Sequence, residues 1–384
     1  MKKLLMAITA TLALVACNNN NTGKGNGTDK AVAPKNPYDT VDLSFVKLPE
    51  GFKISVYAMV PNARSITQSP GGVLYVGNKD EDKVYAVVDK NKDGIADTVY
   101  IIASGLNMPN GVAFKDGALY VAEVNRILRF DDIDNHLENP PAYKVVYDKY
   151  PDKAHHGWKF IAFGPDGKLY VPVGAPCNIC NEKDSIFASI TRINPDGSDL
   201  EIFAHGVRNT VGFAWHPSTK DLWFTENGRD MMGDDVPFCE LNYAPEKGMH
   251  FGYPFYHQGD IPDPEFGKGH KAAEFVAPAL KVGPHAAPLG MRFYTGSQFP
   301  EAYKNQIFIA EHGSWNRTDP YGYQVKVAYL DGNKVTKYED FATGFLTADK
   351  KVLGPPVDIE VNPDGSIFVS DDMNGYIYKI EYKK

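Results

Sequence analysis

One pattern recurs six times along this chain: a turn built on Gly or Pro-Asp-Gly, followed by a short and mostly apolar strand. Most successive copies begin about 45 to 60 residues apart. The six strands occupy residues 73–76, 118–121, 169–171, 222–224, 307–309 and 367–369. This spacing is typical of four-stranded sheets repeated around a central axis. The sequence therefore predicts an all-β protein, a six-bladed β-propeller.

A generic β-sandwich is the alternative, but sandwiches space their turns by roughly 8–12 residues and few reach this length as one domain. A propeller carries its function in the loops around the central channel, just before and after each repeated strand. The longest gap, between residues 224 and 307, is rich in Gly, Pro, His and aromatic residues. It indicates either an insertion at about 245–290 over the channel or two weakly marked strands.

Charge excludes one class of partner. The 384-residue chain has a formal net charge of −8, and its basic residues are scattered along the sequence. Proteins that bind nucleic acid concentrate Lys and Arg on one face. We therefore expect no nucleic-acid partner, and a chain of this length can bury a large core as one domain.

Residues 1–17 have the pattern of an export signal. Two lysines precede an apolar run that is too short to cross a bilayer and that ends at Cys17. The end of this run resembles the bacterial lipoprotein signal, in which the Cys is lipidated. Residues 18–37 are a polar tether, and the propeller is expected over 38–384. The resemblance implies an exported protein, lipid-anchored to a bacterial membrane on its periplasmic or cell-surface side. An ordinary secretory signal with an incidental Cys is the alternative.

Three further cysteines remain. Cys177 and Cys180 form a Cys-x-x-Cys pair directly after the third repeated strand. Asn181 follows it, so covalent haem attachment is not supported, and the lack of a second pair excludes a four-Cys zinc site. In an exported protein a disulfide that staples the loop is favoured over a redox centre. Cys239 is left without a partner.

Polar and cationic side chains stand beside the repeated strands. His155 and His156 precede the third strand, Arg208 and Asn209 precede the fourth, and His312 follows the fifth. The two histidines alone are equally consistent with loop residues that bond to the backbone. Their combination with Arg and Asn on neighbouring blades instead favours a general base beside cationic groups. That arrangement suits an anionic organic cofactor and an alcohol to be oxidised.

These motifs resemble the quinoprotein glucose/sorbosone dehydrogenase family, six-bladed propellers that bind pyrroloquinoline quinone with calcium. The resemblance runs from about residue 48 to the C-terminus and is closest to the sorbosone dehydrogenase-like branch, which shares the Cys-x-x-Cys loop. It rests on His156 eight residues before Gly-Pro-Asp, Gly-Val-Arg-Asn at 206–209, Glu-Asn-Gly-Arg-Asp at 226–230 and His-Gly-Ser-Trp-Asn-Arg at 312–317.

The resemblance implies a role for each matching residue. His156 matches the family's general base, and Arg208 and Asn209 match residues that contact the quinone carbonyls. The backbone oxygens of Gly228 and Arg229 match the calcium ligands. It further implies a sugar, aldose or polyol substrate. Because the chain has no Cys-x-x-Cys-His motif, the electron acceptor is expected to be external.

The chain departs from the family in the last blade. Pro355 and Val357 stand where arginines are expected to bind the carboxylates of the cofactor. A tricarboxylate needs cations to offset its desolvation. The cations that could replace them are Lys79, Arg126, Arg292 and Arg317, with His312 as a further cofactor-binding candidate. A second departure is Cys239, where relatives usually carry Asp.

A separate metal candidate lies at 89–97. Asp89, Asn91, Asp93 and Asp97 place oxygen ligands as in an EF-hand calcium loop, with Gly at the sixth place. The twelfth place is Tyr100, so the bidentate Glu is missing. The pattern predicts either a structural calcium ion or a plain hairpin turn.

Two other functions stay open from the sequence. One is a non-catalytic propeller that binds glycans or proteins, which the missing arginines would permit. The other is a metal-dependent hydrolase similar to gluconolactonases, with oxygen ligands drawn from Glu226, Asn227, Asp230 and Asp358.

Overall fold

Six sheets, each built on four antiparallel strands, form a ring from Thr40 onward in the computed structural model, which describes residues 37–383. Blades one to three are β2 (Ala63–Gln68), β3 (Leu74–Asn78), β4 (Val84–Val88) and β5 (Thr98–Ala103); β6 (Gly111–Lys115), β7 (Ala118–Ala122), β8 (Ile127–Phe130) and β9 (Lys144–Tyr147); and β10 (Ala162–Phe163), β11 (Leu169–Val173), β12 (Ser189–Ile193) and β13 (Glu201–His205).

Blades four to six are β14 (Phe213–Trp215), β15 (Leu222–Glu226), β16 (Phe238–Ala244) and β20 (Leu280–Pro284); β21 (Pro288–Phe293), β22 (Ile307–Glu311), β23 (Gln324–Asp331) and β24 (Lys334–Ala342); and β25 (Pro356–Val361), β26 (Ile367–Asp371), β27 (Tyr376–Tyr382) and β1 (Phe52–Met59). Three short 3₁₀ helices complete the described elements: η1 (Ile133–Asn135), η2 (Ala272–Glu274) and η3 (Glu301–Tyr303). No helix among the described residues is long and apolar enough to cross a membrane.

The structure confirms the six-bladed prediction. Each of the six repeated strands is the second strand of its blade, namely β3, β7, β11, β15, β22 and β26. Every residue in these strands is buried, because each blade packs against a neighbour on both faces. This explains why they read as continuous apolar runs rather than as alternating patterns.

The core lies between neighbouring blades rather than in one central mass. One cluster joins blade six to blade one, with Tyr57, Phe368 and Ile377 packed against Ile66 and Leu74. Equivalent clusters fill the spaces between blades one and two, two and three, three and four, and four and five. The rigid ring therefore fixes the loops at the ends of the strands.

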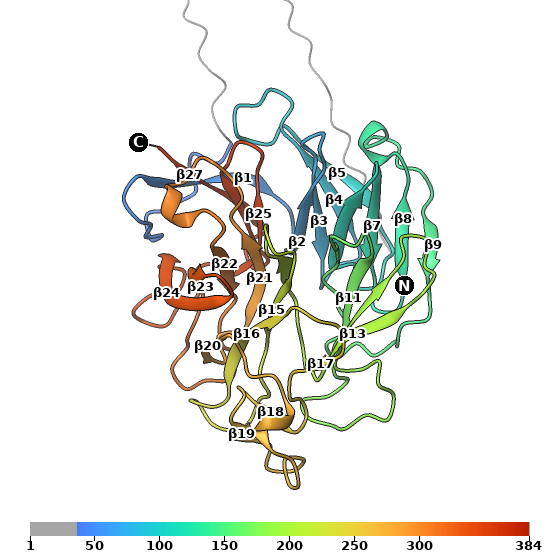
Figure 1. The fold of residues 1–384 in the computed structure, drawn as a ribbon. Helices are drawn as coiled ribbons and strands as arrows, with labels where there is room; N and C mark the ends of the chain where they lie inside the picture. Colours follow the sequence, from blue (N-terminus) through green and yellow to red (C-terminus); the bar gives the residue numbers. More distant parts are fainter. Residues whose placement is uncertain (1–36, 384) are drawn as a thin grey trace, which may run out of the picture. The chain divides into compact units, whose positions relative to one another are not determined.

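The inner strands approach one another closely around the channel. In Figure 1, β2, β21 and β25 lie toward the middle of the molecule, whereas β9 and β24 lie at its edge. Glycine permits this approach: a Cβ at Gly290 in β21 would lie 2.2 Å from Oδ1 of Asp358 in β25. A Cβ at Gly212 would lie 2.1 Å from the carbonyl oxygen of Leu289.

Blade six closes the ring by joining distant parts of the sequence. Strand β1 pairs with β27, with Phe52 opposite Tyr382 and Met59 opposite Tyr376. The first strand of the described chain therefore completes the sheet formed by its last three strands.

The expected insertion lies between β16 and β20. It contains β17 (Met249–His250), which pairs in parallel with β13 of blade three, and a small hairpin of β18 (Tyr256–His257) and β19 (Ile261–Pro262). Strand β20 belongs to blade four, so the insertion ends before Leu280 rather than near residue 290.

Candidate active site

A cavity of about 480 Å³ lies at one end of the blades, where the loops after the second strands meet the segments that begin the inner strands. Four blades contribute to its lining, which consists of Arg64, Lys79, His156, Trp158, Arg208, Asn209, Asn227, Gly228, Asp230, Cys239, His285, Ala287, Leu289, His312, Gly313, Trp315, Asn316 and Tyr323. The propeller thus brings His156, Arg208, Asn209, Gly228, Lys79 and His312 of the sequence prediction to one site.

His156 is placed as a hydrogen-bond acceptor toward the cavity. Its ring is buried, and Nδ1 lies 2.8 Å from the carbonyl oxygen of Ala175. A carbonyl can only accept, so Nδ1 carries the proton and Nε2 keeps its lone pair. Burial, together with Arg208 and His155, lowers the pKa of His156 to about 2. The imidazole is therefore neutral at physiological pH.

His155 differs from its neighbour. It is exposed and is not among the residues that line the cavity. The backbone φ of His156 is +50°, in the left-handed region, and this turn directs the two adjacent histidines differently. The structure therefore separates the two histidines that the sequence left as a pair.

Arg208 is buried and its guanidinium group is held on several sides. Nε donates to the carbonyl oxygen of Asn178 at 2.8 Å, and Nη1 donates to that of Asn227 at 3.1 Å. Nη2 donates to Oδ1 of Asn178 and to Oδ2 of Asp230. Its backbone N–H donates to Glu226, which lies beneath the site. A guanidinium has five N–H donors, so one Nη1 hydrogen has no acceptor among the described residues.

A second group of cations lies across the cavity on blade one. Arg64 forms a 2.7 Å ion pair with Asp372, whose carboxylate also lies 3.0 Å from Nε2 of His312. Lys79 lies over the Trp158 ring, 4.6 Å from its centroid, and its nearest carboxylate is that of Asp80 at 3.7 Å. Burial, and then the Arg64 charge, lower the pKa of Lys79.

Two buried side-chain oxygens in the lining lack partners. Oδ1 of Asn227 and Oδ1 of Asn316 accept no hydrogen bond from any described residue. Buried polar atoms are rarely left unpaired, because the lost hydration is not replaced. The Asn316 amide is fixed by its bond to Oδ1 of Asp230 at 2.7 Å. These oxygens point to a missing donor or cation in the cavity.

Arg317 is not part of this arrangement, contrary to the expectation that it converges with His156 and Arg208. Its guanidinium bonds to the backbone oxygens of Asp234 and Asp319 and does not line the cavity. The other two substitute cations are also engaged elsewhere: Arg126 pairs with Glu123, and Arg292 pairs with Glu360. The side chain of Arg229 turns away to Asp263 in the insertion, so only its backbone concerns the site.

Cys177 and Cys180 form a disulfide, as the loop-staple prediction requires. Cys239 is a free, buried thiol that lines the cavity. Burial raises its pKa to about 11, so the thiol is protonated at neutral pH. The lipidation candidate Cys17 lies outside the described residues.

The 89–97 loop does not gather its oxygens around one point. Asp89 accepts from Gly94 N, Asp97 accepts from Lys90 N, and Asp93 accepts from Ile95 N. Within residues 37–383, no group of three or more His, Cys, Asp or Glu is placed to hold a metal ion. The loop has the contacts of the hairpin turn that was the alternative to a calcium site.

The hydrolase ligand set is not gathered either. Asp358 is buried and bonds to Ile66 N in the ring of inner strands, and Glu226 is buried behind Arg208. Neither lines the cavity, which leaves only Asn227 and Asp230 of the four candidate ligands there.

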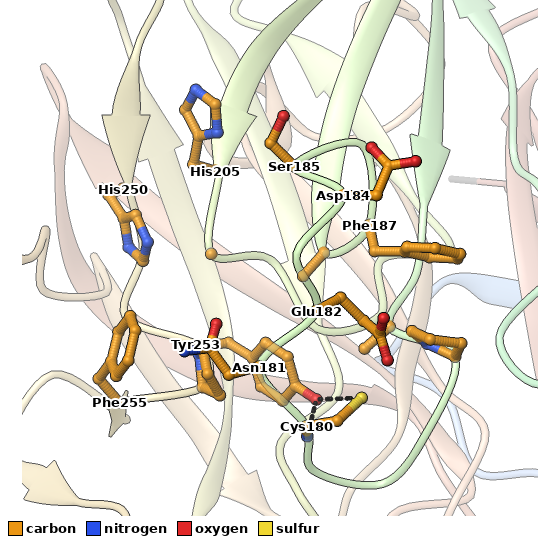
Figure 2. A pocket seen from close by; sticks show the side chains of 15 residues that line it. Cys180, Asn181, Glu182, Asp184, Ser185, Phe187, His205, His250, Tyr253 and Phe255 are labelled. Atoms are coloured by element: carbon orange, nitrogen blue, oxygen red, sulfur yellow. Dashed lines mark hydrogen bonds between the residues drawn. The ribbon is translucent and has the colours of Figure 1, made fainter. Parts of the chain in front are cut away.

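A smaller pocket of about 150 Å³ lies beside the disulfide loop (Figure 2). It is lined by His205 and His250 on one side and by Cys180 and Glu182 on the other. Tyr253 lies between these sides, and its hydroxyl accepts from Cys180 N at 3.0 Å. This pocket holds none of the predicted cofactor residues, so the larger cavity is the candidate active site.

Sequence reasoning missed Arg64, which is the most informative of the cavity residues it did not name. Arg64 lies ten residues before β3, much as His156 and Arg208 lie before the second strands of blades three and four. The same offset rule applied to the first blade would have found it.

Comparison with known proteins gives a consistent result. The model of the glucose/sorbosone dehydrogenase family matches residues 120–379. An uncharacterized protein of Borreliella burgdorferi is 33% identical over 358 residues, covering 89% of this chain and 92% of that protein.

Two solved structures share the fold. The calcium structure of a Trichoderma reesei carbohydrate-active enzyme of family AA12 has a TM-score of 0.76 and 19% identity, covering 88% of this chain and 97% of that one. The holo form of the PQQ domain of pyranose dehydrogenase from Coprinopsis cinerea has a TM-score of 0.73 and 18% identity, again over 88% and 97% of the two chains.

Proposed function

This chain belongs to the glucose/sorbosone dehydrogenase family, and from that premise we propose that it oxidises a sugar or related polyol with pyrroloquinoline quinone and calcium in the channel cavity. The observation that carries the proposal is the neutral, buried His156, with Nε2 free to accept, in a cavity that Arg64, Lys79 and Arg208 also line. The names of the similar structures, a PQQ domain in its holo form and a calcium structure, support the choice of cofactor.

The residues of the cavity fit such a cofactor. An anionic quinone needs cations, and Lys79 has no carboxylate within normal hydrogen-bond distance while Arg208 has one N–H to spare. Calcium prefers oxygen ligands, and the unpaired oxygens of Asn227 and Asn316 lie in the same lining as Gly228. Lys79 and Arg64 on blade one supply positive charge in place of the arginines missing at Pro355 and Val357.

The chemistry divides between the cofactor and the chain. When bound, the quinone with its calcium ion supplies the hydride acceptor. His156 accepts the proton of the sugar hydroxyl at Nε2, and its bond to Ala175 fixes both the tautomer and the ring orientation. Leu289 and Ala287 give the cavity an apolar wall. Trp315, 73% exposed at the cavity, offers an aromatic face on which a sugar can stack. The electrons leave to an external acceptor.

Reconstitution tests the proposal directly. The purified protein is mixed with the quinone and calcium, and reduction of a dye is followed with a panel of aldoses and polyols. His156→Gln should keep quinone binding and lose turnover by roughly 10²–10⁴-fold, the usual contribution of a positioned base. His155→Ala is the matched control and should retain most activity. Absence of quinone binding by the unmutated protein would reject the proposal in favour of the glycan- or protein-binding propeller.

We also propose that the protein is exported and lipid-anchored through Cys17. The support is the sequence pattern of residues 1–17 alone. Cys17→Ser should release the protein from the membrane fraction or block its processing. If the variant fractionates like the unmutated protein, the anchor proposal is wrong.

A further inference from the structure

Asn178 makes an unusually complete set of contacts with two residues of the active site. Its carbonyl oxygen and Oδ1 both accept from Arg208, at 2.8 and 2.9 Å. Its Oδ1 also accepts from Asp230 N at 2.8 Å, and its Nδ2 donates to the carbonyl oxygen of Asp230 at 3.1 Å. Asn178 therefore takes two of the five donors of Arg208 and fixes the plane of the guanidinium.

The short loop that carries Asn178 is braced on both sides. The disulfide between Cys177 and Cys180 closes it, and Cys180 N donates to the hydroxyl of Tyr253. Tyr253 belongs to the insertion, and its own N–H donates to the carbonyl oxygen of Gly206, two residues before Arg208. Figure 2 shows the Tyr253 hydroxyl against Cys180 beside the smaller pocket. The loop and the insertion thus meet behind Arg208.

This bracing matters because a long, cationic side chain loses entropy when it is fixed. Arg208 lines the cavity with one Nη1 hydrogen left for a ligand, and that hydrogen has a defined direction only if the other four are held. A guanidinium fixed before binding donates to an anion without a further ordering cost.

We propose that Asn178 is the positioning residue for Arg208, and that the Cys177–Cys180 disulfide and Tyr253 hold it in place; the ligand in this role rests on the proposed quinone function. The disulfide is then structural rather than a redox centre, and the insertion contributes to cofactor binding without reaching the cavity through Tyr253.

Quinone affinity, measured by titration calorimetry with calcium present, tests this role without relying on turnover. Asn178→Ala should weaken binding by roughly 10- to 100-fold, the equivalent of one or two hydrogen bonds to a charged group. Asn178→Asp keeps the oxygen that accepts from Arg208 and should recover most of the affinity. Asn181→Ala is the matched control, because Asn181 is an exposed Asn in the same loop, just outside the disulfide.

A double-mutant cycle separates positioning from general stabilisation. If Asn178 acts through Arg208, Asn178→Ala should have no further effect on quinone affinity once Arg208 is already Ala. The Cys177→Ser, Cys180→Ser double variant should weaken binding in the same non-additive way. Variants are preferred to reducing agents here, because a thiolate is a nucleophile that would attack the quinone itself. Effects that add fully to Arg208→Ala would overturn the proposal.

A ligand-free measurement distinguishes failure of this inference from failure of the proposed function. The Nε–H of Arg208, assigned in NMR spectra by its loss in Arg208→Lys, should exchange slowly with solvent and should lose that protection in Asn178→Ala. If the unmutated protein binds no quinone but shows this protection, the function is wrong and the positioning stands. Rapid exchange of this N–H in the unmutated protein would reject the positioning itself.

Discussion

His156 is a base whose burial determines the acid side of the pH profile. Burial, Arg208 and His155 lower its pKa to about 2, and a lower pKa keeps the neutral, proton-accepting form to lower pH. We therefore expect kcat/KM for the sugar to stay level from about pH 8 down to about pH 5, where a histidine with the ordinary pKa of about 6.5 would be mostly protonated. The measurement is the pH profile of quinone-loaded protein. A midpoint near the ordinary value would show that the base is another, more exposed group.

Lys79 is a residue whose removal should separate binding from stability. It is partly desolvated beside the like charge of Arg64, which disfavours the ammonium in the empty site. Lys79→Met keeps the apolar stem over Trp158 and removes the charge. We expect quinone affinity to fall by roughly tenfold or more and the urea midpoint to stay the same or rise.

Lys153→Met, in an exposed position before β10, is the control and should change neither quantity. If Lys79→Met binds quinone as tightly as the unmutated protein, the blade-one cations do not replace those missing from blade six.

Offsets from the repeated strands predicted which residues reach the cavity when the backbone fixes them directly. Lys79 and His312 follow their strands at once, and a ring of blades must place such residues at one end. Arg317 lies farther from its strand, and there the loop folds back so that its guanidinium binds Asp234 instead. Sequence spacing carries no information about where a long loop turns, which is why this part of the prediction was wrong.

The segment after β11 connects the two sides of the site. Ala175 N donates to the carbonyl oxygen of Arg208, and its own carbonyl accepts from His156. Gly174 precedes it, and a Cβ there would lie 2.5 Å from Cβ of His156. Gly174→Ala should therefore displace the base and lower kcat by roughly 10²-fold with little change in quinone affinity, since small misplacements have effects of this size.

The control for this element is Gly167→Asn in the turn before β11. Nothing lies within 4 Å of a Cβ there, and its φ of +77° is one that Asn tolerates. Circular dichroism of both variants should match that of the unmutated protein. If Gly174→Ala retains full activity, the contact between this segment and His156 does not set the position of the base.

Elements with strong local signals were predictable, and elements defined by pairing were not. The second strands are continuous apolar runs and were all identified, whereas β20 is short, contains Gly283 and Pro284, and pairs with β16 only after the insertion. Its place in blade four depends on a partner almost 40 residues earlier in the chain, so the insertion looked longer than it is. The 89–97 loop shows the converse case, because one pattern of Asp, Asn and Gly serves both a metal loop and a hairpin turn.

At the scale of the whole molecule, the cavity depends on a ring that only β1 and β27 close. Blade six contributes no residue to the cavity lining, yet its Asp372 holds both Arg64 and His312. The stability of the closing blade and the affinity of the site are therefore linked only through the intact ring. A substitution in the closing blade that leaves the ring folded should change the first without the second.

Ile377 in β27 tests this separation. Its side chain is fully buried in the cluster between blades six and one, and no residue of β27 lines the cavity. Ile377→Ala should lower the free energy of unfolding by about 2–5 kcal/mol, through lost burial and the space left behind, while unfolding stays a single transition. Quinone affinity at a temperature where the variant is fully folded should match that of the unmutated protein. Ile101→Ala, at a position 54% exposed on the outer strand β5, should change stability by no more than about 0.5 kcal/mol. Urea melts of both variants provide the measurement, and two separate transitions in Ile377→Ala would mean that the blades unfold independently and that closure does not hold the ring together.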